Sequence, residues 1–265
     1  MEVIILKEPQ QIAKKCADIF EKTIREKNNA VLGLATGSTP ILLYRELVER
    51  YQQQLLSFKN VVTFNLDEYV GLDPQHSQSY SYFMQQNLFK HIDISPENTH
   101  LPNGVAQNPI CESREYENKI RAYGIDLQLL GLGSNGHIGF NEPTSSLGSQ
   151  TRIKTLAPQT IEDNSRFFSA DEFQPTLAIT MGIGTIMSAK RIVLLAIGEK
   201  KARAIQQAIE GPVSAWCPAS ALQMHAHTTF IIDEEAARLL QMKDYYHWVY
   251  KQQQQLEQKL GKVYE

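Results

Sequence analysis

The chain has 265 residues, of which 42% are hydrophobic and 21% are charged, and its formal net charge at pH 7 is -3. These values are ordinary for a globular protein of one large domain or two small ones. Because the charge is near neutral and no basic block stands out, we expect no nucleic-acid partner. Because no apolar run approaches the roughly 18 residues that span a bilayer, we also expect no membrane partner.

The predicted elements begin with an apolar run at residues 3–6, which is too short for the apolar part of a signal peptide and predicts a first strand. Further short apolar runs alternate with longer amphipathic patterns and are typical of strands buried on both faces of a parallel sheet. The other predicted strands are residues 30–35, 61–65, 127–131, 177–180, 191–197 and 228–232, and the predicted helices are residues 10–27, 40–50, 109–123, 199–209 and 245–260.

This alternation predicts right-handed βαβ units and a Rossmann-like α/β fold, with an open, mostly parallel sheet and helices on both faces. Thr39 is expected to cap the helix that follows it, with Pro40 at the first helical position. No linker or internal repeat divides the chain, so we expect a single domain over residues 1–265. Three scattered cysteines without a CxxC pair indicate a reducing compartment and hence a cytoplasmic protein.

The loop after the strand at 30–35 is the first candidate site, because ligands of such sheets bind beyond the carboxyl ends of the strands. Gly37 permits a close approach of the backbone, and Ser38 and Thr39 offer hydroxyl and N–H groups at the start of a helix. These features predict a phosphate site, and the alternative is a simple capping turn. The loop is not a P-loop, since the lysine and the spacing of that motif are absent.

Two acidic residues, Asp67 and Glu68, follow the buried run at 61–65. A carboxylate at this edge can be partly desolvated, which raises its pKa and suits it to act as a general base. The alternative is a surface turn with two solvated acids. The spacing does not decide which of the two carboxylates points into the crevice.

The loop after the strand at 127–131 matches the G-x-G-x-x-G pattern at residues 131–136. A dinucleotide site would need a helix next, which Pro143 forbids, so we expect no nucleotide cofactor. His137 and Glu142 follow in the same loop. A histidine titrates near neutral pH, and a carboxylate nearby can orient its ring, so we favour a proton-transfer pair over a histidine that only stabilises the loop.

Two further cations, Arg166 and Lys201, lie in segments suited to holding a phosphate, although either could be an ordinary surface charge. His225 and His227 form an H-x-H pair with no third ligand in view, so we expect no metal.

Four motifs, at residues 34–40, 64–72, 136–143 and 164–168, together resemble the glucosamine-6-phosphate deaminase family, and the match runs in order over nearly the whole chain. The resemblance implies that glucosamine 6-phosphate and water become fructose 6-phosphate and ammonia, by aldose–ketose isomerisation and deamination in amino-sugar catabolism. It implies no redox cofactor and no metal.

The resemblance also implies roles for individual residues. Asp67 would move the proton between C2 and C1, His137 would open the sugar ring, and Glu142 would support His137. The implied phosphate ligands are Ser38, Thr39, Arg166 and Lys201. The residue patterns agree, because an amino aldose must open before C2 can lose its proton, and this requires two proton-transfer centres.

The chain departs from the family pattern at two places. Asn135 stands where some members carry aspartate, and an amide can only hydrogen-bond and orient at the catalytic site. Ser145, Arg152 and Lys154 match residues through which allosteric members bind the activator N-acetylglucosamine 6-phosphate, but our alignment puts His247 at the position of a further tyrosine. Because the family includes monomers and homo-oligomers, activation and assembly stay open.

Two alternative functions fit the same fold. A 6-phosphogluconolactonase-like hydrolase would need no C2 base, so the pairing of Asp67 with His137 and Glu142 argues against it. A non-catalytic sugar-phosphate sensor should carry a DNA-binding segment, and neither the first strand at residue 3 nor the glutamine-rich tail predicts one.

Overall fold

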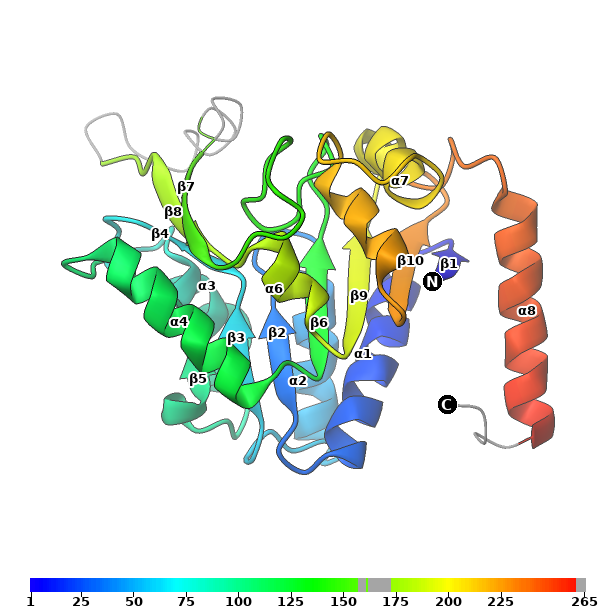
Figure 1. Ribbon diagram of the computed structural model, residues 1–265. Helices are drawn as coiled ribbons and strands as arrows, with labels where there is room; N and C mark the ends of the chain where they lie inside the picture. Colours follow the sequence, from blue (N-terminus) through cyan, green and yellow to red (C-terminus); the bar gives the residue numbers. More distant parts are fainter. Residues whose placement is uncertain (157–160, 162–172, 261–265) are drawn as a thin grey trace.

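The computed structural model describes residues 1–156, 161 and 173–260, which form an α/β fold around a parallel sheet (Figure 1). The elements in chain order are β1 (Glu2–Leu6), α1 (Pro9–Glu26), β2 (Val31–Leu34), α2 (Ile41–Gln52), β3 (Val62–Asn65), β4 (Asp67–Tyr69), α3 (Tyr80–Asn87), η1 (Phe89–His91), η2 (Pro96–Asn98), β5 (Thr99–His100), α4 (Pro109–Tyr123), β6 (Leu127–Gly131), β7 (Arg152–Thr155), β8 (Leu177–Thr180), α6 (Ile183–Met187), β9 (Arg191–Ala196), η3 (Glu199–Lys201), α7 (Ala202–Ile209), η4 (Pro218–Met224), β10 (Thr228–Asp233) and α8 (Lys243–Leu260).

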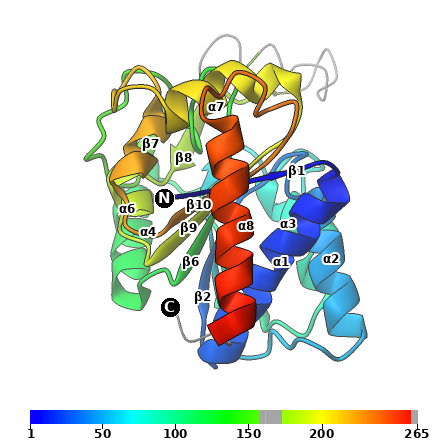
Figure 2. The same cartoon turned by 90° about the vertical axis from the view of Figure 1, so that its right-hand side faces the viewer.

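The main sheet contains, within the described residues, seven parallel strands in the order β1-β10-β9-β6-β2-β3-β5. Its inner strands β2 and β3 are buried at every residue, because helices cover both faces. α1, α2 and α3 lie on one face, and α4 and α6 lie on the other (Figures 1 and 2). The expected α/β fold is confirmed, and the strands predicted for this sheet agree with the observed ones to within one residue at each end.

The strand order reverses between β2 and β6. The strand that follows β2 in the chain, β3, lies on one side, whereas the next main-sheet strand after β6, β9, lies on the other. A reversal of this kind opens a crevice at the carboxyl ends of the two strands, where ligands of open α/β sheets bind. The loops that follow β2 and β6 therefore flank the expected site.

A small sheet lies at this same edge and contains, in the part of the chain that the structure describes, the antiparallel strands β4, β8 and β7 in that order. The single residue Leu66 joins the two sheets. Its N–H donates to Leu34 O of the main sheet at 3.0 Å, and its carbonyl accepts from Met181 N just beyond β8 at 2.7 Å. β4 and β7 were not predicted, because two acids in one and two cations in the other hide the apolar pattern of a strand.

The start of α2 differs from the prediction. Pro40 is the N-cap, the helix begins at Ile41, and no side chain caps it, so the expected cap at Thr39 is wrong. Pro40 already has a helical φ of -78° and has no N–H to satisfy. Tyr44 fixes this end instead, since its hydroxyl donates to Ala35 O at 2.5 Å and its N–H donates to Pro40 O at 2.9 Å.

The expected C-terminal helix is α8, which is fastened to the end of α7. The carboxylate of Glu210 accepts hydrogen bonds from the N–H groups of Gln241 and Met242 and from the hydroxyl of Tyr246. Tyr246 and Tyr250 then pack on the core. The helix itself lies beside β1 (Figure 2). Among the described helices, none is long and apolar enough to cross a membrane.

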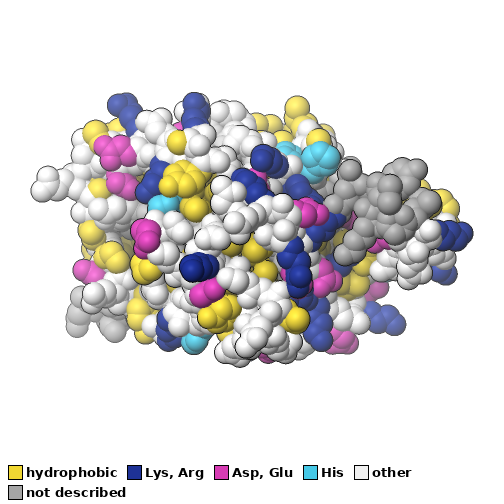
Figure 3. All heavy atoms as spheres, turned by 90° about the horizontal axis from the view of Figure 1, so that it is seen from below, with side chains coloured by type: hydrophobic (Ala, Val, Ile, Leu, Met, Phe, Trp, Pro, Cys, Tyr) yellow, Lys and Arg dark blue, Asp and Glu magenta, His cyan; other side chains and the backbone are white. Residues whose placement is uncertain are grey.

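The face seen from below in Figure 1 is the amino edge of the main sheet. Basic, acidic and hydrophobic side chains are intermixed on it (Figure 3). At this edge Asp126 pairs with Lys27 at 2.6 Å and with Lys190 at 2.9 Å. These pairs join neighbouring elements, and the residues predicted to be functional gather at the opposite edge.

Candidate active site

Asp67 begins β4 and is only 6% exposed. The loop after β6 lies against it, because a Cβ on Gly139 would stand 3.3 Å from Asp67 Oδ2. Burial, and secondarily the charge of Glu68, raises the pKa of Asp67 to about 8. A carboxylate with a pKa in this range is suited to take a proton from carbon near neutral pH.

Glu68 has a different environment, although it is adjacent in sequence. Its carboxylate accepts three backbone hydrogen bonds, from Tyr69, Tyr80 and Ser81, at 2.9, 3.0 and 2.8 Å. Burial raises the pKa of Glu68, and these hydrogen bonds oppose the rise. Two of the donors are the first residues of α3, so Glu68 holds the start of that helix. Of the acidic pair, Asp67 is the one that faces the loop after β6.

His137 and Glu142 lie together in that loop, with Asn135 joined to both. His137 Nδ1 is 3.4 Å from Glu142 Oε2, a separation within the range of an ion pair but long for a hydrogen bond. Asn135 Nδ2 donates to Glu142 Oε2 at 2.7 Å, and Asn135 Oδ1 accepts from the His137 N–H at 3.2 Å. The amide is therefore placed to orient both partners.

The glycines of this loop create the space for its side chains. A Cβ on Gly133 would lie 2.3–2.5 Å from atoms of the His137 ring, and a Cβ on Gly136 would lie 2.6 Å from Cys217 Sγ. Residues 137–151 form turns and no helix, all of them within the described part of the chain. The arrangement lacks the helix that a dinucleotide pyrophosphate would require at this position.

Ser38 and Thr39 lie in the loop between β2 and α2, beside the reversal of strand order. Gly37 has a φ of +99°, and its Cβ position is open, so the turn leaves its backbone accessible. Ser38 is exposed and Thr39 is half-buried. Their hydroxyl and N–H groups precede α2, where the helix dipole favours an anion.

Lys201 ends η3 and immediately precedes α7, at the carboxyl end of β9. The turn before it is held by Asp233, whose two carboxylate oxygens accept from the Gly198 N–H at 3.0 and 2.9 Å. Gly198 has a φ of +92°, which a residue with a Cβ rarely adopts. The fourth predicted phosphate ligand, Arg166, lies outside the described residues.

The residues matched to an activator site fall in two places. Arg152 and Lys154 occupy alternate positions of β7 and therefore share a face of the small sheet, and burial lowers the pKa of Arg152. Ser145 is buried, and its hydroxyl has no hydrogen-bond partner within the described residues. His247 lies on α8, with its Nε2 3.5 Å from Glu234 Oε1. This helix is at the far end of the molecule from β7 (Figure 1). The tail therefore does not join the β7 residues within one chain.

His225 and His227 take part in hydrogen bonds with nearby backbone groups. His225 Nε2 contacts Ala189 O at 2.8 Å, and its Nδ1 accepts from the His227 N–H. In residues 1–156, 161 and 173–260, no group of three or more His, Cys, Asp or Glu side chains is placed to hold a metal.

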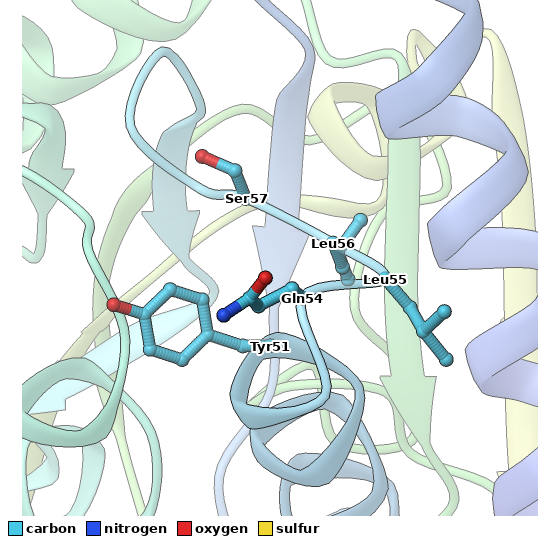
Figure 4. Close-up of a pocket in the computed structure, with 5 residues that line it drawn as sticks. All are labelled: Tyr51, Gln54, Leu55, Leu56 and Ser57. Atoms are coloured by element: carbon cyan, nitrogen blue, oxygen red, sulfur yellow. The ribbon is translucent and has the colours of Figure 1, made fainter.

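A hollow of about 390 Å³ lies at the end of α2, at the amino edge of the sheet (Figure 4). It is lined by Tyr51, Gln54, Leu55, Leu56 and Ser57. This lining has no carboxylate, imidazole or cation, and it is remote from Asp67 and His137. The candidate catalytic residues therefore lie away from this hollow, at the carboxyl edge of the sheet.

Sequence reasoning missed an aromatic cluster beside Asp67. The Tyr80 hydroxyl donates to the Tyr69 hydroxyl at 3.2 Å. The rings of Tyr80 and Phe140 are stacked, with their centroids 6.0 Å apart and an angle of 4° between their planes. The Tyr80 hydroxyl also hydrogen-bonds to Thr36, in the loop that carries Ser38. These residues join β4, α3 and two site loops, and the aromatic positions showed no common period by which to find them.

Comparison with known proteins places these observations in a family context. The family model described as glucosamine-6-phosphate isomerases/6-phosphogluconolactonase matches residues 8–231. The glucosamine-6-phosphate deaminase of Hahella chejuensis is 61% identical over 250 residues, which are 94% of this chain and 95% of that protein.

Solved structures give the same picture. The structure of a monomeric glucosamine-6-phosphate deaminase has a TM-score of 0.87 and 46% identity, and covers 90% of this chain and 100% of its own. A 6-phosphogluconolactonase from Trypanosoma cruzi has a TM-score of 0.74 and 22% identity, with 91% and 97% covered. At that identity the likeness concerns the fold alone.

Proposed function

The chain belongs to the glucosamine-6-phosphate isomerase/6-phosphogluconolactonase family, and from this premise we propose that it is a glucosamine-6-phosphate deaminase. It converts glucosamine 6-phosphate and water to fructose 6-phosphate and ammonia. The observation that carries this choice within the family is the presence of two separate proton-transfer groups at the same edge of the main sheet. Asp67 is one of them, and the His137–Glu142 pair is the other.

The two groups divide the reaction between them. His137, supported by Glu142, moves a proton at the ring oxygen, so that the C1–O5 bond opens to the aldehyde. Asp67 takes the proton from C2 and returns it to C1 through an enolamine, leaving an imine at C2. Water adds to that carbon, and the C–N bond breaks to release ammonia. Asn135 orients His137 and Glu142 without itself exchanging protons.

Phosphate binding is assigned to Ser38, Thr39 and Lys201, with Arg166 as the fourth ligand implied by the family resemblance. The open turn at Gly37 and the start of α2 support the first two. The position of Lys201 at the head of α7 supports the third. No redox cofactor or metal enters this scheme, because each step is a proton transfer, an addition or an elimination.

We further propose that N-acetylglucosamine 6-phosphate activates the enzyme through Ser145, Arg152 and Lys154. Size-exclusion chromatography with light scattering distinguishes a monomer from a homo-oligomer, and the family resemblance is compatible with either. We place the enzyme in the cytoplasm, because its three cysteines are all free. We also propose that residues 1–265 form one domain.

A lactonase is the second candidate, since 6-phosphogluconolactonases share the fold. Lactone hydrolysis needs no base at C2, so the buried Asp67 would have no role in that reaction. Ammonia release from glucosamine 6-phosphate by metal-free protein, measured with and without N-acetylglucosamine 6-phosphate, separates the two. Ammonia and fructose 6-phosphate in equal amounts support the deaminase. Hydrolysis of 6-phosphogluconolactone without ammonia release would replace the proposal with the lactonase.

A further inference from the structure

The turn at residues 138–141 is fastened to the end of β8 by two buried polar side chains. Phe140 N–H donates to Thr180 Oγ1 at 3.1 Å, and Asn141 Nδ2 donates to Met181 O at 2.8 Å. The same amide donates at 2.9 Å to the first residue of the turn and so closes it. Thr180 and Asn141 are both fully buried, so neither is exposed to a substrate.

This turn separates the two members of the ring-opening pair, because His137 immediately precedes it and Glu142 immediately follows it. A movement of the turn therefore moves both side chains together.

The strand that receives the turn is also the neighbour of Asp67. Asp67 and Thr180 are register partners in the antiparallel pair β4–β8, so their side chains stand next to each other on one face. Gly139 touches both, because a Cβ there would lie 3.0 Å from Thr180 Oγ1 and 3.3 Å from Asp67 Oδ2. A single threonine thus contacts the turn of one proton-transfer group and the strand of the other.

We propose that Thr180 and Asn141 are positioning residues, which set the distance between the Asp67 carboxylate and the His137–Glu142 pair. The inference rests on the proposed deaminase function, since only a reaction with two proton-transfer centres requires that distance. A substrate held by its phosphate must present its ring oxygen to His137 and its C2 to Asp67. A displacement of about 1 Å between such groups lowers a rate by about 100-fold.

The test compares four variants, at Thr180, Asn141 and Thr63, with the wild-type protein under steady-state conditions. Thr180→Val keeps a similar shape but removes the acceptor of the Phe140 N–H, and Thr180→Ser keeps the hydroxyl. Thr63→Val is the matched control, because Thr63 is an equally buried strand threonine whose hydroxyl has no partner in the described residues. Each variant is assayed below its own thermal unfolding transition, so that only folded protein is compared.

We expect Thr180→Val to lower kcat by about 10- to 100-fold with KM within about twofold, because the phosphate ligands stay in place. Thr180→Ser should recover most of the rate, and Thr63→Val should keep the wild-type kcat. Asn141→Leu should repeat the fall in kcat. If folded Thr180→Val turns over within twofold of wild type, or falls no further than Thr63→Val, the positioning role is refuted. Wild-type protein without deaminase activity would instead refute the proposed function, before any variant is compared.

Discussion

Asp67→Asn should abolish turnover and at the same time stabilise the folded protein at alkaline pH. The pKa of Asp67 is raised from 3.8 to about 8 in the folded protein because the carboxylate is buried. The folded state therefore binds this proton more tightly than the unfolded chain does. Its contribution to stability is fully present below pH 3.8 and is lost as the pH rises through about 8.

The magnitude follows from the difference between the two pKa values. At about pH 7 the group is ionised in the unfolded chain but mostly protonated in the folded one, and this uptake of a proton costs the fold on the order of 4 kcal/mol relative to low pH. Asparagine cannot ionise and avoids this cost. The gain in free energy of unfolding of Asp67→Asn over wild type should therefore grow by about 3 kcal/mol between about pH 5.5 and about pH 8.5.

Urea unfolding followed by circular dichroism at several pH values measures this gain, and ammonia release measures the activity. Glu68→Gln is the matched control, since its carboxylate accepts three backbone hydrogen bonds and its loss should destabilise the start of α3. A stability gain that does not change with pH would show that Asp67 is not desolvated. A kcat near the wild-type value would show that Asp67 is not the base.

Three further substitutions test other parts of the site. His137→Gln should slow the cyclic substrate by about 10²–10⁴-fold, and an unchanged kcat would remove His137 from the mechanism. Gly133→Ala should displace the His137 ring and lower kcat, whereas Gly148→Ala, where a Cβ meets nothing within 4 Å, should not. Lys201→Ala should mainly raise KM, and a large fall in kcat at constant KM would contradict a phosphate-binding role.

Six of the seven described strands of the main sheet could be predicted because they are largely apolar and buried, whereas the two-residue strand β5 was not predicted. A run such as that at residues 191–196 is apolar after its first residue. The helices between the strands show apolar residues at the spacing of helical turns. α4 was predicted with the observed bounds because proline marks its first residue and Gly124 follows its last.

The small sheet could not be predicted as a separate sheet: β8 was predicted, but as a strand of the parallel sheet, and β4 and β7 were missed because they are short and polar. β4 carries Asp67 and Glu68, and β7 carries Arg152 and Lys154, so neither shows an apolar run. Their order depends on long-range register that no local pattern contains. This is also why the sequence left open which of the two acids faces the site.

The candidate residues Asp67, His137 and Glu142 were identified from their loops, but their environments required the structure. The role of Gly133 in making room for His137 depends on a contact between residues four apart in a turn, which spacing does not show. Thr180 and Asn141 carried no signal of their own, because a buried threonine and a buried asparagine are common in any fold. Their importance comes only from the partners that they meet.

The connection through Leu66 has a consequence for protein engineering. Its N–H is hydrogen-bonded to the main sheet and its carbonyl to the end of β8 in the small sheet. The link between β3 and Asp67 therefore has a fixed length of one residue. Side chains alternate along a strand, and inserting or deleting one residue here would turn Asp67 to the opposite face of β4. Libraries that aim to change substrate scope should therefore vary residue identity around this junction and keep its length constant.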